Sequence, residues 1–224
     1  MLYDFVLDGD SVVQNKIISK YETLIKGLTD RLCEESKTQY YFKELYVKAG
    51  EGGTPATDND SYYQDGTIPF VKIEDLSSKY IVTNKDYISQ LGLSESSAWI
   101  VPSNSVIYSN GATIGCVSIN SYPVATKQGI LGIVPSKTVL AEYLYYYLQT
   151  TYFRKQIKRI TVKGTMDCAY LKDINFISCF IPATSHQQTA VHILSSIDKK
   201  LLVERNVLLK LKEQKNYLLS KMFI

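Results

Sequence analysis

The chain has few of the side chains that usually build catalytic or metal centres. Its 224 residues include only two histidines and four cysteines. No two cysteines form a C-x-x-C pair, and neither histidine has a cysteine at the spacing of a zinc ligand, so we expect no metal site. Reduced, buried thiols are the expected state of the cysteines. The residues concerned are His186, His192, Cys33, Cys116, Cys168 and Cys179.

Long apolar runs are also missing. No run reaches the roughly 18 apolar residues that a membrane-spanning helix needs. The first ten residues, MLYDFVLDGD, are acidic and lack the positively charged start of a signal peptide. We therefore expect a cytoplasmic protein that does not bind membranes.

Catalytic motifs are absent as well. The sequence has no G-x-S-x-G, no P-loop and no H-E-x-x-H. Asp58 and Asp60 resemble the start of a calcium loop, but the glycine and the later glutamate are not at the required offsets, so a solvated turn is favoured. Glu74 and Asp75 are neighbours on an expected strand and would point to opposite faces. The sequence predicts no catalysis by this chain.

The N-terminal segment has the pattern of a helix. Apolar residues recur there at steps of three and four, which places them on one face of a helix. Asp10 or Ser11 is the expected N-cap. The predicted apolar stripe consists of Val13, Ile17, Tyr21, Leu24, Leu28 and Leu32.

The C-terminal segment predicts a much longer helix. From His192 to Ile224 there is no proline or glycine, and apolar residues alternate at steps of three and four, as in the seam of a coiled coil. Glu204 and Lys215 take the remaining seam positions, where polar residues fix register at a cost in stability. A helix over 187–223 would be about 55 Å long, more than a compact domain of this size can cover. Its seam should therefore bury against the N-terminal helix or against a second copy of the chain. The seam consists of Leu194, Ile197, Leu201, Leu208, Leu211, Leu218 and Met222.

The middle of the chain has the pattern of an α+β domain. Strand-like runs (IPFVKI, SVIYS, CVSI and GILGIVP) are separated by turns with glycine, proline and asparagine. Residues 140–160 interrupt them with helical periodicity. The sequence thus predicts an N-terminal helix within 1–37, an α+β domain over 38–185 and a long C-terminal helix over 186–224.

One basic run lies in this middle segment. FRKQIKRITVKGT holds five lysines and arginines and no acidic residue. On a helix, Lys155, Lys158 and Arg159 share a face, which is either an ordinary solvated surface or a surface that contacts phosphates. The loops GGTPATDNDSYY, DLSSK and YSNGAT carry hydroxyl and amide side chains that can bond to base edges and phosphates.

Taken in order, five motifs resemble the specificity subunits of type I restriction–modification systems. GGTPAT (52–57) is similar to the motif that opens a target recognition domain, and GTIPFVKIEDL (66–76) to the strand and turn that follow. The segments SSAWIVPSNSVIYSNGATIGCVSI (96–119) and VATKQGILGIVP (124–135) are similar to the central signatures of that family. Residues 164–201 are similar to the exit from the domain into a long helix.

The resemblance implies a DNA-recognition subunit with no catalytic activity and no cofactor of its own. Partner modification subunits would bring S-adenosylmethionine and methylate adenine N6, and a motor and nuclease subunit can join them. The chain has no Pro-Pro dipeptide, hence no NPPY motif, which agrees with that division of labour. A full-length specificity subunit has two recognition domains, whereas this chain has one, so the resemblance implies a half-length form. A homodimer with two-fold symmetry would restore the pair.

Candidate DNA contacts are polar or basic residues of the motif loops. The family often has an arginine where Asn110 stands and an asparagine where Lys127 stands. Lys127 and Lys163 are expected to contact phosphates, and Gln128 to make two hydrogen bonds with an adenine. For each candidate the alternative is a structural role, such as closing a turn. The candidates are Thr54, Thr57, Lys72, Ser78, Ser109, Asn110, Thr113, Lys127, Gln128, Lys163 and Thr165.

Two other functions remain open at the level of sequence. One is a stand-alone DNA-binding or decoy recognition domain without a methyltransferase partner, and the other is a coiled-coil scaffold that binds only protein. Co-purification with a methyltransferase and DNA mobility shifts separate these three possibilities.

Overall fold

The computed structural model describes residues 2–34, 38–164 and 167–222, and the side chains of 11–31, 38–164 and 167–221. Its contacts divide the chain into two compact units. Residues 1–31 and 189–224 form the first, here called the helical unit, and residues 32–188 form the second, here called the recognition domain.

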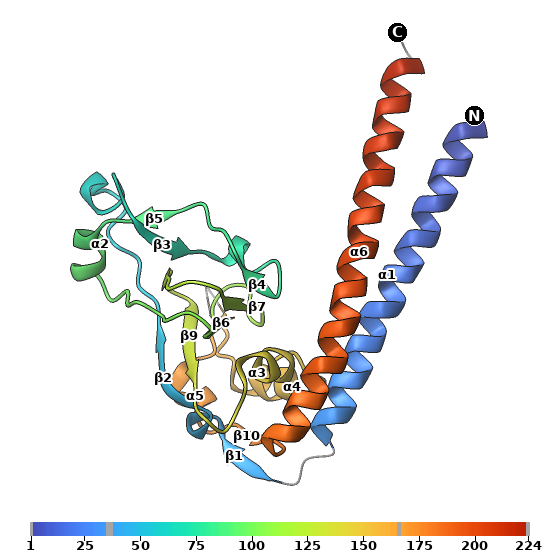
Figure 1. Ribbon diagram of the computed structural model, residues 1–224. Coiled ribbons are helices and arrows are strands. Elements are labelled where there is room, and N and C mark those ends of the chain that lie inside the picture. Colours follow the sequence, from blue (N-terminus) through green and yellow to red (C-terminus); the bar gives the residue numbers. More distant parts are fainter. Residues whose placement is uncertain (1, 35–37, 165–166, 223–224) are drawn as a thin grey trace. The chain divides into compact units, whose positions relative to one another are not determined.

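The helical unit is a pair of antiparallel helices from the two ends of the chain. Helix α1 (Leu2–Glu34) and helix α6 (Thr184–Met222) run in opposite directions along each other (Figure 1). The Gln14 side-chain amide donates hydrogen bonds to the Glu204 carbonyl, at 2.9 Å, and to the Glu204 carboxylate. Arg205 forms an ion pair with Glu22 at 2.7 Å. The N-terminal helix is thus a partner of the long C-terminal helix, as one of the two predicted arrangements required.

Burial along α6 follows the predicted seam. Leu194 and Leu201 are buried, and the polar seam residues Glu204 and Lys215 are half-buried. The side chain of Met222 lies outside the described residues. The half-buried apolar seam residues are Ile197, Leu208, Leu211 and Leu218.

The apolar stripe predicted for α1 is partly wrong. The helix runs from Leu2, so the N-cap is at neither Asp10 nor Ser11. Of the predicted stripe, Val13 and Leu24 are 56% and 46% exposed. Ile17, Tyr21 and Leu28 are half-buried, and the side chain of Leu32 lies outside the described residues. The buried face lies about one position further along the helix and includes polar residues that find hydrogen-bond partners within the helical unit, which a count of apolar residues does not anticipate. The buried residues of this face are Gln14, Ile18 and Thr29.

The recognition domain is built on three sheets. The largest has five strands in the order β2-β9-β6-β7-β4 (Figure 1). A three-stranded sheet has the order β5-β3-β8. Strands β1 (Gln39–Tyr41) and β10 (Ser178–Phe180) pair separately. All four strand-like runs noted in the sequence form strands. The strands of the two larger sheets are β2 (Tyr46–Glu51), β3 (Ile68–Val71), β4 (Tyr80–Ile81), β5 (Tyr87–Ile88), β6 (Val106–Ser109), β7 (Val117–Asn120), β8 (Ala125–Thr126) and β9 (Ile130–Pro135).

The pairing directions bring five strand ends to one edge of the largest sheet. Strand β9 is antiparallel to both β2 and β6, β6 is antiparallel to β7, and β7 is parallel to β4. As a result β2 and β6 end where β4, β7 and β9 begin. This edge, with the loops 52–57, 77–79, 110–116 and 127–129 that leave it, is here called the recognition edge.

The helical stretch predicted over 140–160 is two helices. Helix α3 (Ala141–Tyr147) packs against the largest sheet, and helix α4 (Thr151–Ile160) follows after a short break. The Thr150 hydroxyl accepts a hydrogen bond from the Phe153 amide at 3.1 Å and so caps α4. A side-chain cap of this kind stabilises the start of a helix. It explains why a new helix begins at Thr151, although the sequence pattern predicted one helical stretch. The remaining short helices are α2 (Gln90–Ser94), α5 (Leu171–Ile174) and the 3-10 turns η1 (Phe42–Glu44), η2 (Asp60–Tyr62) and η3 (Ile73–Asp75).

The first turn of α6 belongs to the recognition domain. Gln187 is fully buried, and its carbonyl oxygen accepts a hydrogen bond from the Leu140 amide at 2.9 Å. Its amide nitrogen donates to the carbonyl oxygens of Thr138 and Pro182, each at 2.8 Å. One glutamine therefore joins the beginning of the long helix to the segment that precedes α3.

Two expectations concern membranes and thiols. In the ranges that the structure describes, no helix is long and apolar enough to cross a membrane. Cys116, Cys168 and Cys179 are free thiols. Cys179 is buried as expected, but Cys116 and Cys168 are half-buried, so the expected burial was wrong for these two. The side chain of Cys33 lies outside the described residues.

Candidate nucleic-acid interface

The recognition edge gathers loops that lie far apart in the sequence. The Gly52 amide donates to the Ile130 carbonyl at 2.9 Å, which joins the end of β2 to the beginning of β9. A Cβ atom at Gly52 would come within 1.9 Å of the Thr126 carbonyl oxygen, so only glycine allows this close approach. The motif GGTPAT thereby places its threonines beside the loop 127–129.

Two side chains of the GGTPAT region hold the loop 127–129 in place. The Glu51 carboxylate accepts a hydrogen bond from the Gly129 amide at 2.8 Å. The Thr54 hydroxyl accepts one from the Gln128 amide at 3.4 Å. Gly129 has a φ of 84°, a conformation that favours glycine. The side chains of Lys127 and Gln128 stay exposed at the tip of this loop.

A second lysine lies beside Lys127. Strands β3 and β8 are parallel, with Val71 opposite Thr126, so the residues that follow, Lys72 and Lys127, leave the sheet side by side. Lys72 forms an ion pair with Asp86 at 2.7 Å, and this hydrogen bond raises the pKa of Lys72. Lys72 is therefore a fully charged but partly neutralised side chain.

The loop 110–116 is shaped from within by two predicted contact residues. Ser109 is buried; its hydroxyl donates to the Thr113 carbonyl at 2.6 Å and accepts from the Cys116 amide at 2.8 Å. Asn110 is also buried, and its amide donates to the Ala169 carbonyl at 3.2 Å. Their side chains shape the edge without being exposed on it, which corrects their expected place on the DNA-contacting surface.

The other predicted contact residues have different surroundings. Thr113 is exposed on the loop 110–116, and Thr57 on the loop 52–57. Ser78 is exposed at the β4 end of the edge, where its hydroxyl donates to the Tyr80 carbonyl at 2.8 Å. Lys163 is 78% exposed and forms an ion pair with Asp167 at 2.5 Å. Thr165 lies outside the described residues.

The segment after α4 also reaches this edge. The Ala112 amide donates to the Asp167 carbonyl at 3.1 Å, and Gly111 pairs with Cys168 in an isolated bridge. Burial, followed by the negative charge of Glu51, raises the pKa of the Cys168 thiol. The Cys168 thiol therefore stays neutral at physiological pH, unlike a reactive cysteine.

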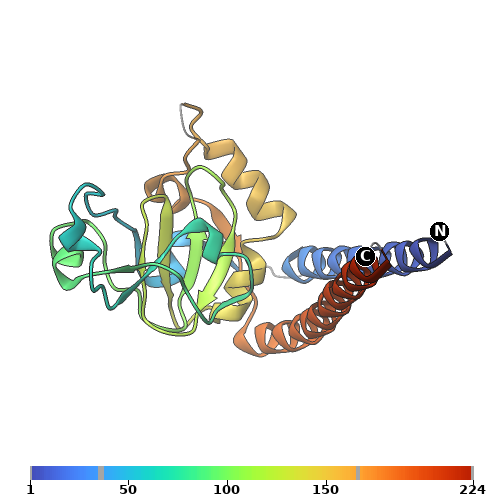
Figure 2. The same ribbon diagram turned by 90° about the horizontal axis from the view of Figure 1, so that it is seen from above.

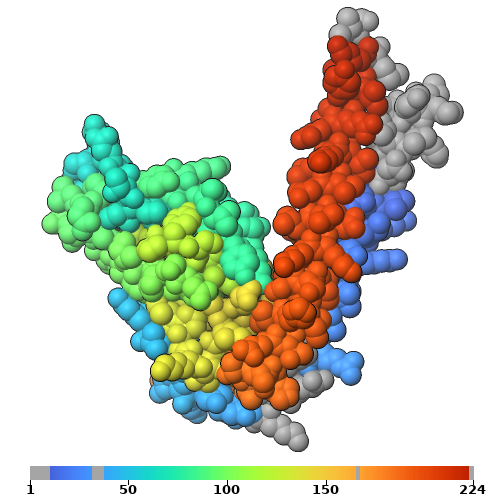
Figure 3. Space-filling view, viewed as in Figure 1, coloured from blue at the N-terminus to red at the C-terminus, as the bar shows by residue number. Residues whose placement is uncertain are grey.

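Chemically, the edge offers hydroxyl, amide and ammonium groups on loops held by a rigid sheet. Such groups suit hydrogen bonds to base edges and contacts to phosphates. No group of three histidine, cysteine, aspartate or glutamate side chains within the described part of the chain is placed to hold a metal ion. In Figure 3 the segments around β3, β5 and α2, in cyan and green, form one end of the same domain.

Comparison with known proteins agrees with this arrangement. The family model for the type I restriction modification DNA specificity domain matches residues 41–213, which include the whole recognition edge. The chain belongs to this family. Its specificity subunits recognise DNA and are not themselves enzymes.

Comparison with individual members of the family shows how much of each protein is covered. The chain is 29% identical over 182 residues to the type I restriction enzyme MjaIX specificity subunit of Methanocaldococcus jannaschii, with 80% of this chain and 40% of that protein covered. A crystal structure of the HsdS subunit from Thermoanaerobacter tengcongensis matches with a TM-score of 0.64 and 14% identity, covering 97% of this chain and 55% of the other. A chain from a structure of type I R-M complex assembly matches with a TM-score of 0.70 and 14% identity, covering 99% and 56%. The chain thus spans about half the length of these proteins.

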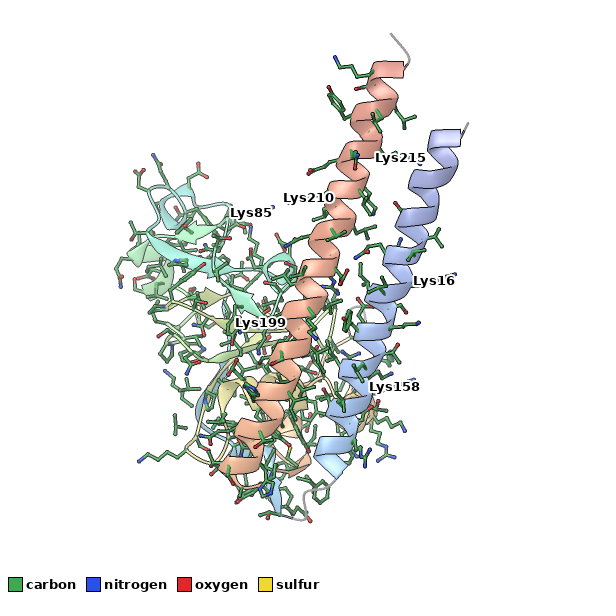
Figure 4. All side chains as sticks on the ribbon, turned by 45° about the vertical axis from the view of Figure 1, so that its right-hand side comes forward. Lys16, Lys85, Lys158, Lys199, Lys210 and Lys215 are labelled. Atoms are coloured by element: carbon green, nitrogen blue, oxygen red, sulfur yellow. The ribbon has the colours of Figure 1, made fainter. Side chains whose placement is uncertain are left out.

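Sequence reasoning missed three structurally important residues: Glu51 and Lys85 lie near the recognition edge, and Gln187 lies beyond the opposite end of β9. Glu51 and Gln187 act through backbone groups of segments far away in the sequence, so no local pattern marks them. Lys85 is exposed in the loop before β5, next to Asp86, and is labelled in Figure 4. The antiparallel pairing of β3 and β5 brings this loop toward Lys72. A strand-pairing prediction would have found Lys85.

Proposed function

We propose that this chain is the sequence-reading subunit of a type I restriction–modification complex and has no catalytic activity of its own. The observation that supports this function most directly is the gathering of the family's motif loops at one edge, with Lys127, Gln128 and Thr113 exposed there. Modification subunits would bind beside it, supply S-adenosylmethionine and methylate adenine. A restriction subunit can join such a complex.

We propose further that two copies of the chain work as a symmetric pair. Residues 32–188 of each copy supply one recognition domain, and the chain covers 40% of one relative and about 55% of the structural neighbours. A two-fold pair makes every interface contact twice. Light scattering of the chain at micromolar concentration, with and without the modification subunit, tests this arrangement, and a strict monomer in both conditions would contradict it.

The paired form predicts the shape of the DNA target. Two copies related by a two-fold axis present the same recognition edge in opposite orientations, so the target should be an inverted repeat. Half-sites read from one side of the duplex lie about 34–36 Å apart, one turn of B-DNA. We expect two short inverted half-sites, each with an adenine, around a non-specific spacer.

Methylome sequencing tests the proposal directly. Cells expressing the chain with its modification subunit should carry methyladenine in both half-sites of an inverted, interrupted motif. An asymmetric or uninterrupted motif would contradict the symmetric pair while leaving DNA recognition in place. If no new methylation appears and the chain still shifts DNA without a methyltransferase partner, a stand-alone or decoy DNA-binding protein is the better description.

A further inference from the structure

Helix α4 carries a basic face that the proposed function does not yet use. Four of its ten residues are lysine or arginine, and all four are exposed. Their spacing places them along one side of the helix. No aspartate or glutamate occurs between residues 143 and 166. This face, here called the α4 basic face, consists of Arg154, Lys155, Lys158 and Arg159.

The opposite side of α4 is fixed in the core. Phe153 and Ile157 are buried, and the Phe153 ring lies 5.8 Å from that of Phe42, 6.0 Å from that of Tyr147 and 6.2 Å from that of Tyr108. Aromatic contacts at these distances stabilise packing beyond the area they bury. The α4 basic face is therefore held on a rigid support, and the helix itself lies along one side of the recognition domain (Figure 2).

The end of α4 lies close to the recognition edge. Val162, two residues beyond the helix, pairs with Cys168, and Cys168 pairs with Gly111 of the edge loop 110–116. Since paired residues on neighbouring strands have Cα atoms about 5 Å apart, Val162 lies about 10 Å from Gly111. Lys163 follows directly and is exposed. The α4 basic face and the recognition edge are thus carried by neighbouring segments of the recognition domain, and Lys163, paired with Asp167, lies between them.

We propose that the α4 basic face binds the sugar–phosphate backbone of duplex DNA flanking the half-site that the recognition edge reads. This inference rests on the proposed function. Exposed lysines and arginines without acidic neighbours on their own helix attract the regularly spaced charges of a DNA backbone. The closeness of α4 to the edge loop 110–116 favours DNA over an acidic protein as the occupant, because a duplex lying on the edge extends beyond its half-site.

The test compares two double variants of the full chain that lose the same charge. Lys155→Gln with Lys158→Gln removes two charges from the α4 basic face; Lys158 is labelled in Figure 4. Lys43→Gln with Lys137→Gln removes two exposed charges near the opposite edge of the sheet, where β2 begins and β9 ends. The probe is a duplex of random sequence about 40 base pairs long, because phosphate contacts do not depend on sequence. Binding is measured by fluorescence anisotropy between about 50 and 200 mM salt.

The α4 double variant should bind the duplex more weakly and with a smaller salt dependence. The slope of log K against log salt is negative, and each lost phosphate contact reduces its magnitude by about 0.9, so two lost contacts reduce the magnitude by roughly 1.8. The control variant should keep the wild-type slope. Equal slopes for the wild type and the α4 variant would overturn the proposal.

Two further outcomes separate the inference from the function beneath it. If the wild-type chain does not bind DNA with or without its modification subunit, the proposed function itself fails. If the α4 variant keeps the wild-type salt slope but no longer co-purifies with the modification subunit, the face binds an acidic protein surface and the DNA assignment is overturned.

Discussion

Among single residues, Glu51 has the most consequential position. Its carboxylate holds the Gly129 amide and lies close enough to Cys168 to raise the pKa of that thiol. It therefore joins the end of β2 to the loop 127–129 of the recognition edge. We interpret Glu51 as a positioning residue for the loop that presents Lys127 and Gln128.

Glu51→Gln should lower the pKa of Cys168 because it removes the neighbouring negative charge. The thiolate fraction then rises, and alkylation of Cys168 by iodoacetamide at about pH 8 should become faster. The amide oxygen of glutamine can still accept from Gly129, so the loop should keep its shape. Glu95→Gln, at an exposed position, serves as the charge control. An unchanged alkylation rate would show that Glu51 does not act on this thiol.

Glu51→Ala should instead release the loop. The Gly129 amide loses its acceptor, and the loop conformation is destabilised by about 1 kcal/mol. If binding needs this conformation, the affinity for the half-site falls several-fold. We expect weaker discrimination between the methylome-defined half-site and a duplex with one altered base pair, as measured by competition binding. Equal discrimination by the wild type, Glu51→Gln and Glu51→Ala would argue against a positioning role.

Gln187→Leu should destabilise the chain. The substitution leaves the Leu140 amide and the Thr138 and Pro182 carbonyls without their buried partner, and an unsatisfied buried group costs about 1–3 kcal/mol. Thermal unfolding followed by circular dichroism should show a melting temperature lower by several degrees. Gln188→Leu changes the exposed neighbour and should have little effect. Similar melting temperatures for the two variants would contradict a structural role for Gln187.

At the scale of elements, the spacing of apolar residues correctly predicted most of the helices and strands. The seam of α6 and the strands β3, β6, β7 and β9 follow directly from spacing and turn signals. The sequence could not predict the burial of Gln14 and Thr29, because polar residues enter a helix interface only where partners exist. Gln14 bonds to Glu204, and the Thr29 hydroxyl donates to the Ile25 carbonyl at 2.7 Å.

The candidate site shows the same division. Motif order located the loops of the recognition edge, and Thr54, Thr113, Lys127 and Gln128 all lie there. Ser109 was misplaced because a serine at a strand end can face solvent or close a loop from within, and only the three-dimensional bonds decide. Glu51 and Gln187 bond to backbone groups far away in the sequence, so no local sequence pattern could predict their roles.

Along α6, substitutions of seam leucines and of their exposed neighbours should have very different effects on assembly. Leu201→Lys with Leu208→Lys introduces charges into buried and half-buried positions, at a cost of several kcal/mol if the site stays dry. Leu202→Lys with Leu209→Lys changes positions that are 60% and 58% exposed. The first variant should lose assembly, measured by light scattering and co-purification, while the recognition domain still folds. Normal assembly of the first variant would show that the seam does not carry it.

At the scale of the whole molecule, the length of α6 should set the spacing of the two half-sites. Inserting seven residues within 201–215 keeps the seam in phase and lengthens the helix by about 10.5 Å, or about three base pairs of DNA at 3.4 Å each. The methylome should show a changed spacer and unchanged half-sites. A two-residue insertion turns the seam by about 200° and should abolish assembly. An unchanged spacer with the seven-residue insertion would contradict α6 as the spacing element.

The meeting of five strand ends at one edge affects how the target specificity of such a protein can evolve. Backbone hydrogen bonds between strands hold the sheet together, and these bonds do not depend on which side chains the loops carry. Mutations and exchanges of loop sequence can therefore alter the preferred target while the supporting architecture is inherited intact. The DNA sequence that such a protein recognises can therefore change one loop at a time.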